Sequence, residues 1–316
     1  MVSVPMKNIL VTGACGQIGS ELVSRLSDSY GKAHIISTDI QKPPSSIKRN
    51  SVFHYLNVMD MHMIAKMVVE NDIDTIFHMA AILSATGEKN PQLAYQVNLQ
   101  GTINILEVAR IKRAAKVIIP SSIAVFGPDA PKNDTPNETP LNPTTMYGVT
   151  KAAVEKLLQY YHHKYGLDTR SLRYPGIISS ETAPGGGTTD FAIDMYVKAA
   201  QNEAYVSFID VDTALPFMYM PDAIKALLNL AAADNTRLRR RVYNVGAMRL
   251  TPGDIVSSIQ EQVPNFQCTY APDFRQEIAD SWPNGIDDSC AHEEWDWQPD
   301  YNLKQMTADM LKKLAT

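Results

Sequence analysis

A tyrosine and a lysine four residues apart, Tyr147 and Lys151, are the pair in this sequence best suited to proton transfer. On a helix, this spacing places the phenol and the ammonium group on one face. An adjacent ammonium group stabilises the phenolate and lowers the pKa of the tyrosine toward neutrality, so the tyrosine can act as a general base toward an alcohol. The spacing alone does not decide the assignment, because Tyr160 and Lys164 repeat it further along the same predicted helix.

Two serines, Ser121 and Ser122, favour the first copy of the pair. They follow a β-branched run over 116–120 that we expect to be a buried strand. Doubly wound sheets bind their ligands at the carboxyl ends of the strands, and Tyr147 opens the helix after the following loop, so it can return to that edge. The second copy lies several turns away and is predicted to be at the surface. The predicted catalytic residues are Ser122, Tyr147 and Lys151.

A glycine-rich loop follows the first predicted strand and opens the first predicted helix, with glycines at Gly13, Gly16 and Gly19. Gly13 permits a tight turn, and Gly16 lets the backbone approach a pyrophosphate. Gly19 lets the helix pack closely on the strand. The spacing therefore predicts a dinucleotide whose phosphates lie at the helix N-terminus.

An acidic residue indicates which dinucleotide is bound. Asp39 comes twenty residues after Gly19, at the end of the second predicted strand, where a carboxylate can accept hydrogen bonds from both ribose hydroxyls. A carboxylate at this position repels the 2′-phosphate of NADP, and the next residues, Ile40 and Gln41, supply no arginine to bind one. The loop and the acid together predict NAD as the cofactor.

The elements that must position these residues alternate along the first half of the chain. Short β-branched runs and longer amphipathic stretches follow one another, which predicts a doubly wound, Rossmann-type α/β fold. Pro175-Gly176 and a glycine run over 184–187 then break the regularity. We expect an NAD-binding domain over 1–174 and a smaller, mainly substrate-binding α/β lobe over 175–316, with some segments returning to the first sheet. The predicted strands are 8–12, 34–39, 52–56, 75–78, 116–120, 169–173 and 242–244, and the predicted helices of the second lobe are 190–201, 221–233, 251–262 and 303–314.

The composition is that of an ordinary soluble protein, with 316 residues, 45% hydrophobic and 20% charged residues, and a net charge of -5. The short basic cluster from Arg237 to Arg241 is interpreted as a solvated helix end, so no nucleic-acid partner is predicted. No apolar run has the length of a membrane span. No membrane partner is predicted either.

The cysteines and histidines predict no metal site. Cys15, Cys268 and Cys290 are widely spaced without a CxxC motif, which indicates reduced thiols. His162 and His163 lack the spacing of metal ligands. Because the chain runs from its first residues straight into a predicted strand, we expect a cytoplasmic protein, or a mitochondrial one if a targeting segment has been removed.

With these residues in place, the chain resembles the extended short-chain dehydrogenase/reductase family over nearly its full length. Beside the glycine loop and the Tyr147 and Lys151 pair, general marks of this family are His78-Met-Ala-Ala81 and Asn98-Leu-Gln-Gly-Thr102. A narrower likeness is to the epimerase-like L-threonine 3-dehydrogenases. It is carried by the segments 83–88, 120–127, 173–177, 184–190, 215–222 and 278–283.

Two positions depart from the pattern of the resembled family. Asn57-Val58 stands where the family more often has Asp-Val beside the adenine, and an amide oxygen can still accept a hydrogen bond from the adenine amine. Phe217 stands where a methionine is common, which is a change in packing more than in chemistry.

The resemblance implies a role for each matching residue. The residues implied for NAD are Gly13, Gly16, Gln17, Ile18, Asp39, Asn57, Val58, Ala80, Ala81, Asn98, Tyr147, Lys151, Tyr174, Pro175 and Ile177. The residues implied for the substrate are Ser84, Ser122, Tyr147 and Thr188. The residues by themselves leave open a simpler alternative, in which Ser84 and Thr188 only cap turns.

The reaction that the resemblance implies is NAD-dependent oxidation of the β-hydroxyl of L-threonine to 2-amino-3-oxobutanoate, with Tyr147 as the general base. A nucleotide-sugar epimerase or dehydratase is the first alternative, since it uses the same pair. It would need basic residues for two phosphates, and only Arg275 is suitably placed in the second lobe. The second alternative is an NAD-sensing protein without activity, although such proteins typically lose the tyrosine or the lysine.

A homodimer is also predicted. The long helices expected over 91–112 and 145–166 carry apolar residues, among them Leu93 and Val154, in excess of what one sheet can cover. Pairing these helices with a twofold copy would form a four-helix interface, which is common in the resembled family. The glycines at 185–187 are interpreted as a hinge over which the second lobe closes.

Overall fold

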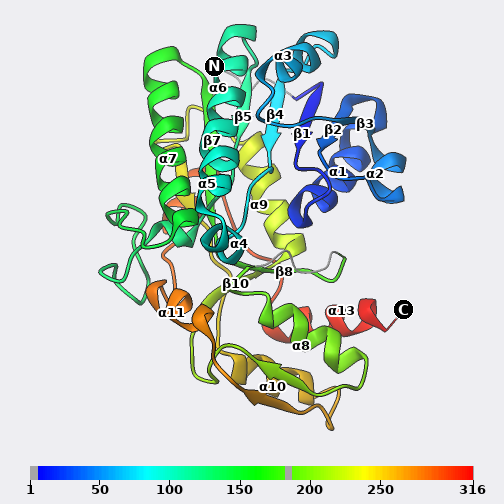
Figure 1. Ribbon diagram of the computed structural model, residues 1–316, viewed down its shortest axis with the longest axis vertical. Helices are drawn as coiled ribbons and strands as arrows, with labels where there is room; N and C mark the ends of the chain where they lie inside the picture. Colours follow the sequence, from blue (N-terminus) through cyan, green and yellow to red (C-terminus); the bar gives the residue numbers. More distant parts are fainter. Residues whose placement is uncertain (1–5, 182–186, 316) are drawn as a thin grey trace.

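The computed structural model describes residues 6–181 and 187–315, which form two lobes (Figure 1). The larger lobe is built on one parallel sheet with the strand order β11-β7-β5-β4-β1-β2-β3, and β6 pairs with β7. The predicted doubly wound α/β class is confirmed. The strands are β1 (Ile9–Thr12), β2 (Ile35–Asp39), β3 (Val52–Tyr55), β4 (Thr75–His78), β5 (Lys116–Ile118), β6 (Ser121–Ser122), β7 (Asp168–Tyr174) and β11 (Val242–Asn244).

Helices cover both faces of this sheet, which explains why its strands are almost continuously apolar. One face packs against a core with α3, α6 and α7, and the other against a core with α1, α9 and α12. Figure 1 shows α6 and α7 side by side along one face. The bounds are α1 (Gln17–Tyr30), α2 (Ser45–Asn50), α3 (Met61–Glu70), α4 (Ser84–Lys89), α5 (Pro91–Ala94), α6 (Gly101–Lys112), α7 (Met146–Tyr165), α9 (Met220–Ala232) and α12 (Ser289–Trp295).

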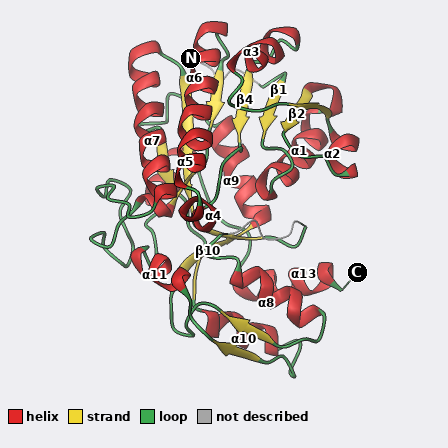
Figure 2. Cartoon of the chain, viewed as in Figure 1, coloured by secondary structure: helices red, strands yellow, loops and turns green. Residues whose placement is uncertain are grey.

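The smaller lobe has its own core around α8, α10 and α13 and a three-stranded sheet of order β12-β10-β8 (Figure 2). Thr251 and Asp254 form the capping box that begins α10. The elements are β8 (Gly176–Ile178), β10 (Leu215–Tyr219), β12 (Met248–Leu250), the pair β9 (Tyr205–Ser207) and β13 (Cys268–Tyr270), and the helices α8 (Phe191–Ala200), α10 (Pro252–Gln260), α11 (Phe274–Ser281) and α13 (Leu303–Leu314).

Two predicted elements differ from the structure. The strand predicted over 116–120 ends at Ile118, and Ser121 and Ser122 form a separate short strand, because Pro120 has no N–H for the ladder. The helix predicted over 91–112 is α5, a π-helical stretch η2 (Tyr95–Gln100) and then α6. Both changes lie next to predicted site residues.

The chain crosses between the lobes more than once. After Tyr174 it enters the small lobe at β8, yet α9 packs on α1, and β11 pairs with β7 in the large sheet. We therefore propose the division into 1–174 and 175–316 with α9, β11 and α12 returning to the first lobe. No helix within the described residues is long and apolar enough to cross a membrane.

One carboxyl group connects the first lobe to the segment after β8. The Ser179 hydroxyl donates a hydrogen bond of 2.6 Å to Oε1 of Glu21, which lies on α1. Burial raises the pKa of Glu21 to about 7. The hydrogen bond from Ser179 acts against this rise, the negative charge of Glu181 increases the pKa further, and the positive charge of Lys313 lowers it. Glu21 therefore stays protonated at pH values where an unfolded glutamate, with a pKa of 4.5, is ionised.

We predict that Glu21→Gln stabilises the protein at alkaline pH. Because folding raises the pKa of Glu21, the stability that neutral Glu21 contributes is full below pH 4.5 and is lost as the pH rises through about 7. Glutamine stays neutral and can still accept from Ser179. The gain in unfolding free energy should grow from near zero in acid to about 3 kcal/mol above pH 8.

Denaturant unfolding of both proteins across this pH range measures the difference. Glu203→Gln, a change at a largely exposed glutamate, is the control and should show little pH-dependent gain. Equal stability of wild type and Glu21→Gln at every pH would contradict the prediction.

Candidate active site

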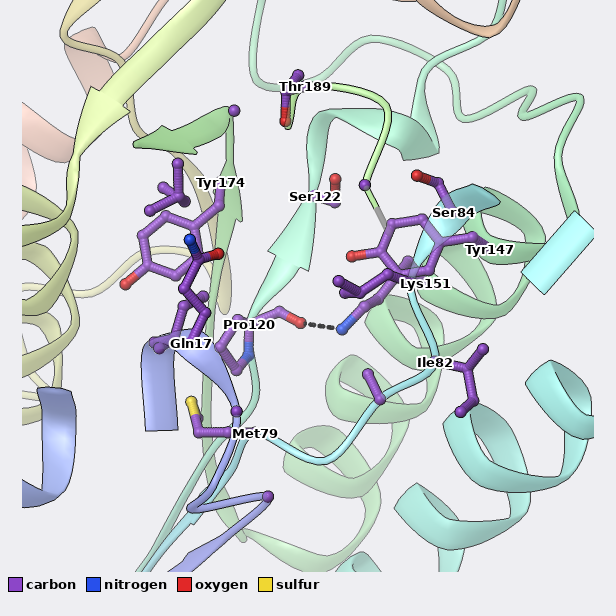
Figure 3. A pocket seen from close by; sticks show the side chains of 18 of the residues that line it. Gln17, Met79, Ile82, Ser84, Pro120, Ser122, Tyr147, Lys151, Tyr174 and Thr189 are labelled. Carbon is purple, nitrogen blue, oxygen red and sulfur yellow. Dashed lines mark hydrogen bonds between the residues drawn. The ribbon is translucent and has the colours of Figure 1, made fainter. Parts of the chain in front are cut away.

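The start of α7 is pressed against the turn that follows β6. Thr145 caps the helix, its hydroxyl accepting from Gly148 N at 3.1 Å. A Cβ at Gly148 would lie 2.1 Å from the Ala124 carbonyl oxygen, so no larger residue fits there without movement. This close approach brings Tyr147 beside Ser122, whose own hydroxyl accepts from Ala124 N at 3.2 Å. Figure 3 shows both side chains pointing into one pocket.

Ser122 and Tyr147 are hydrogen-bonded to each other, and this bond lowers the pKa of the phenol. Burial has the larger, opposite effect and raises the pKa of Tyr147 to about 12. The expected pKa near neutrality is therefore not found in the protein without its ligands. Desolvation outweighs the hydrogen bond because the phenolate loses its hydration in the pocket.

Lys151 lies one turn after Tyr147 and is 7% exposed. Its Nζ donates to the Pro120 carbonyl oxygen at 2.6 Å and lies 5.7 Å from the centre of the Tyr147 ring (Figure 3). Burial lowers the pKa of Lys151 to about 8, against the attraction of Glu155. Burial thus favours the neutral form of both Lys151 and Tyr147 in this state.

The second tyrosine and lysine pair lies elsewhere. Tyr160 is 46% exposed, and Lys164 is also exposed. Lys164 contacts the rings of Tyr160 and Tyr165 on the outer side of α7. The prediction that this copy is at the surface is confirmed.

Another part of the pocket lining, beside Tyr147, joins two residues that are far apart in the sequence (Figure 3). The hydroxyls of Ser84 and Thr188 are 3.2 Å apart, and Thr188 N donates to the Ser84 hydroxyl at 3.3 Å. The Ser84 hydroxyl therefore does more than cap a turn, because it contacts Thr188 from a distant part of the chain. Glu88 accepts from Met146 N at 2.7 Å and so ties α4 to the start of α7.

The cofactor end of the pocket lies at the glycine loop. Gly13 has a φ of +66°, and a Cβ there would lie 2.5 Å from Ala80 N, so only glycine allows the loop to approach β4 this closely. Two buried nitrogens, Gln17 Nε2 and His78 Nε2, have no hydrogen-bond partner, and both residues line the pocket. A narrow glycine cradle with unpaired polar atoms fits a dinucleotide pyrophosphate.

The pocket has a volume of about 520 Å³ and is lined from both lobes. Most of the predicted site residues line it, and they come from the segments that follow β1 and β4, from α1, α4, β6 and α7, and from β7 and the segments after it. The predicted residues that line the pocket are Gly13, Gly16, Gln17, Ile18, Ala81, Ser84, Ser122, Tyr147, Lys151, Tyr174, Pro175, Ile177 and Thr188. Two of the hinge glycines, Gly185 and Gly186, lie outside the described residues.

Five predicted cofactor residues do not line this pocket: Asp39, Asn57, Val58, Ala80 and Asn98. Asp39 accepts from Cys15 N and Gln41 N, both at 2.9 Å, so it shapes the loop edge. Asn98 is 3% exposed and uses its amide on Ile82 N, Ile82 O and the Thr150 hydroxyl. Asn98 therefore positions the wall segment rather than facing the pocket.

Several lining residues were not predicted from the sequence. His78 and Met79 belong to the His78–Ala81 segment, and Trp282 to the 278–283 segment, so the family marks contained them without indicating their role. The His78 imidazole shares a 2.7 Å hydrogen bond with the Thr12 hydroxyl. Burial, and then the charge of Lys151, lower the pKa of His78 to about 3, which keeps it neutral.

Comparison with known proteins places this site in a family. The model of the NAD dependent epimerase/dehydratase family matches residues 9–246. An uncharacterized epimerase/dehydratase of Staphylococcus saprophyticus is 48% identical over 97% of this chain and 96% of its own length. Two solved structures each have a TM-score of 0.94. The L-threonine dehydrogenase of Phytophthora infestans is 49% identical, covering 98% of this chain and 99% of its own. A monomeric L-threonine 3-dehydrogenase from a metagenome is 42% identical, covering 97% and 98%.

These similarities agree with the glycine cradle and the buried tyrosine and lysine pair, and they confirm the predicted family and its cofactor, NAD. The chain belongs to the NAD dependent epimerase/dehydratase family.

Proposed function

We propose that the protein oxidises the β-hydroxyl of L-threonine to 2-amino-3-oxobutanoate, a step of threonine catabolism. The observation that carries this proposal is one pocket lined by two pairs of hydroxyl groups. Ser122 and Tyr147 form one pair, and Ser84 and Thr188 form the other. Similarity to threonine dehydrogenases of known structure over nearly the full chain supports the same substrate.

In the proposed reaction, Ser122 and Tyr147 hold the β-hydroxyl of L-threonine, and Tyr147 removes its proton. Bound NAD would accept the hydride that leaves the β-carbon, so the products are 2-amino-3-oxobutanoate, NADH and a proton. Lys151 supplies positive charge beside the phenol and a hydrogen bond for the nicotinamide ribose. The hydroxyls of Ser84 and Thr188 receive the ammonium and carboxylate groups of the substrate. The burial of this site keeps water away from the reacting atoms.

The cofactor residues are proposed along the glycine loop and the two neighbouring strand ends. Gly13, Gly16 and Gln17 would hold the pyrophosphate, and Asp39 the adenosine ribose. Asn57, Val58, Ala80 and Asn98 are proposed for the adenine side and the cofactor wall. Tyr174, Pro175 and Ile177, which line the pocket, are proposed to contact the nicotinamide.

The charge of the pocket argues against a nucleotide-sugar epimerase. Among its lining residues in the described part of the chain, Lys151 is the only lysine or arginine. Arg275, the candidate for binding a diphosphate, does not line the pocket, pairs with Asp273 and stacks on Phe208. An NAD-sensing protein without activity remains the second alternative, and an assay separates all three.

The thiols suggest the compartment. Cys15, Cys268 and Cys290 are all free. We propose a cytoplasmic location, since free thiols persist where the environment is reducing.

A homodimer is proposed on the outer face of α5, η2, α6 and α7, although Val154, which was expected at this interface, is 1% exposed and packs in the core of the large lobe. The large apolar side chains exposed there are Leu93 (38%), Tyr95 (49%), Ile111 (52%), Val149 (48%), Tyr160 (46%) and Tyr165 (42%). A second copy seated on this face by a twofold axis would cover them all. Because the similar metagenome enzyme is described as monomeric, the oligomeric state of this protein has to be measured.

We predict that Tyr147→Phe lowers kcat for L-threonine by at least about 100-fold, because the general base is lost, while NAD binding changes little. NADH formation with L-threonine, with UDP-galactose and without substrate is the assay. Tyr160→Phe is the matched control, since it removes the same hydroxyl from the exposed copy, and it should keep full activity. Oxidation of L-threonine by Tyr147→Phe at the wild-type rate would overturn the assignment.

Replacement of Asp39 by serine should weaken NAD binding about tenfold and reduce the preference for NAD over NADP, because a carboxylate that binds the ribose and repels a 2′-phosphate is removed. Titration calorimetry with each cofactor measures both effects. Unchanged affinity for NAD and for NADP would exclude Asp39 from the ribose site.

Placing a charge on the outer face, as in Leu93→Glu, should convert a dimer to a monomer, because an unpaired carboxylate would be buried at the interface. Sedimentation velocity gives the mass of each variant. Val206→Glu, at a side chain that is 59% exposed on β9 of the other lobe, is the control and should leave the mass unchanged. A wild-type monomer would refute the dimer.

A further inference from the structure

A buried carboxylate continues the row of reactive groups on α7. Tyr147, Lys151 and Glu155 follow one another at intervals of four residues and so share one face of the helix. Glu155 is 1% exposed and does not line the pocket. The proposed reaction gives it no part, although it lies one turn below the lysine.

The contacts of Glu155 lead to the strands that carry the site. Its Oε1 accepts from the Ser121 hydroxyl at 2.6 Å and from Arg173 Nε at 2.9 Å, and its Oε2 accepts from Arg173 Nη2 at 2.8 Å. Ser121 is joined in the chain to Pro120, which holds Lys151, and to Ser122, which holds Tyr147. The carboxylate thus fixes the short strand β6 from behind.

Stability alone does not account for this buried ion pair. Arg173 also donates to Asn137 O at 2.6 Å and to Asn244 Oδ1 at 3.2 Å. Removing two charges from water costs several kcal/mol per ion, and apolar residues of similar size often stabilise a core as well or better. The presence of the charged Glu155 at this buried position therefore points to a role in the site.

The surroundings of Lys151 show what that role is. The titratable groups that face it are Tyr147 and Glu155 from α7 and His78 from β4, with Arg173 of β7 behind Glu155. Burial makes His78 neutral and lowers the pKa of Lys151 to about 8. Glu155 is the negative group that opposes the loss of the lysine proton.

We propose that Glu155 is a positioning residue that holds the strand of Ser122 and places a negative charge one helical turn from Lys151 while Tyr147 takes the substrate proton. The proposal rests on the proposed dehydrogenase function. Without the carboxylate, a smaller fraction of the protein would carry a protonated Lys151 beside Tyr147, because burial alone favours the neutral amine. Glu155 therefore helps to keep the positive charge of Lys151 in the site.

The test is Glu155→Gln in the full chain, because glutamine keeps the size and an acceptor oxygen but not the charge. NMR titration of lysine labelled with ¹³C at Cε follows Lys151, assigned by its absence in Lys151→Met. We expect the pKa of Lys151 to fall by about one unit in Glu155→Gln. The kcat for L-threonine should fall about tenfold above pH 8, with KM and NAD affinity changed less than about twofold.

Glu107→Gln is the matched control. Glu107 likewise accepts hydrogen bonds from an arginine, Arg110, and from a hydroxyl, that of Tyr161, but on the outer side of the helices. Neither the lysine titration nor kcat should change in this variant. Glu155→Asp, which keeps the charge, should retain the wild-type pKa of Lys151 even if its shorter side chain lowers kcat.

The arginine left unpaired could unfold Glu155→Gln, so Glu155→Gln combined with Arg173→Met is the second variant. It should show a fall of the Lys151 pKa in the same direction, but a smaller one, because the positive charge of Arg173 is removed as well. An unchanged lysine titration in whichever of these variants folds would overturn the proposal and leave Glu155 a purely structural residue. The titration needs no substrate. Failure of the protein to oxidise L-threonine would therefore refute the proposed function without deciding the role of Glu155.

Discussion

The contact on which the site depends is the close approach of α7 to the turn after β6. The backbone of Gly148 lies against the Ala124 carbonyl oxygen at a distance that excludes a Cβ. A bulkier residue would push the helix outward, and the Ser122 and Tyr147 hydroxyls would separate. The absence of a side chain at Gly148 thus lets α7 complete the site at the carboxyl ends of the strands.

Burial at this contact creates an electrostatic difficulty that the rest of the site must solve. Desolvation raises the pKa of Tyr147 and lowers that of Lys151, so both groups favour their neutral forms. A general base and its cation are needed in their charged forms at the moment of proton transfer. Hydrogen bonding by Ser122 favours the charged form of Tyr147, and the charge of Glu155 favours that of Lys151. The positive charge of a bound nicotinamide ring would favour the phenolate and oppose the charge on Lys151.

The two ends of the pocket are assembled differently. The cofactor end is local, since one loop and the ends of adjacent parallel strands form it, and the Gly13 conformation suffices to bring them together. The proposed substrate end joins Ser84 to Thr188 across 104 positions of sequence and across the two lobes. A movement of the small lobe would change this end, because Thr188 is tied to Ser84 through its hydroxyl and its backbone N–H.

The sequence by itself determined the parts that depend on local spacing, namely the alternation of strands and helices and the glycine loop. Hydrophobic periodicity and glycine positions carry this information because each acts within a few residues. Only the tertiary structure decided which side chains meet. It turned Asn98 away from the pocket, brought Trp282 and His78 to it, and buried Tyr147 so deeply that its pKa rises instead of falling. These outcomes depend on desolvation and on contacts between distant segments, and neither quantity is encoded in the spacing of neighbouring residues.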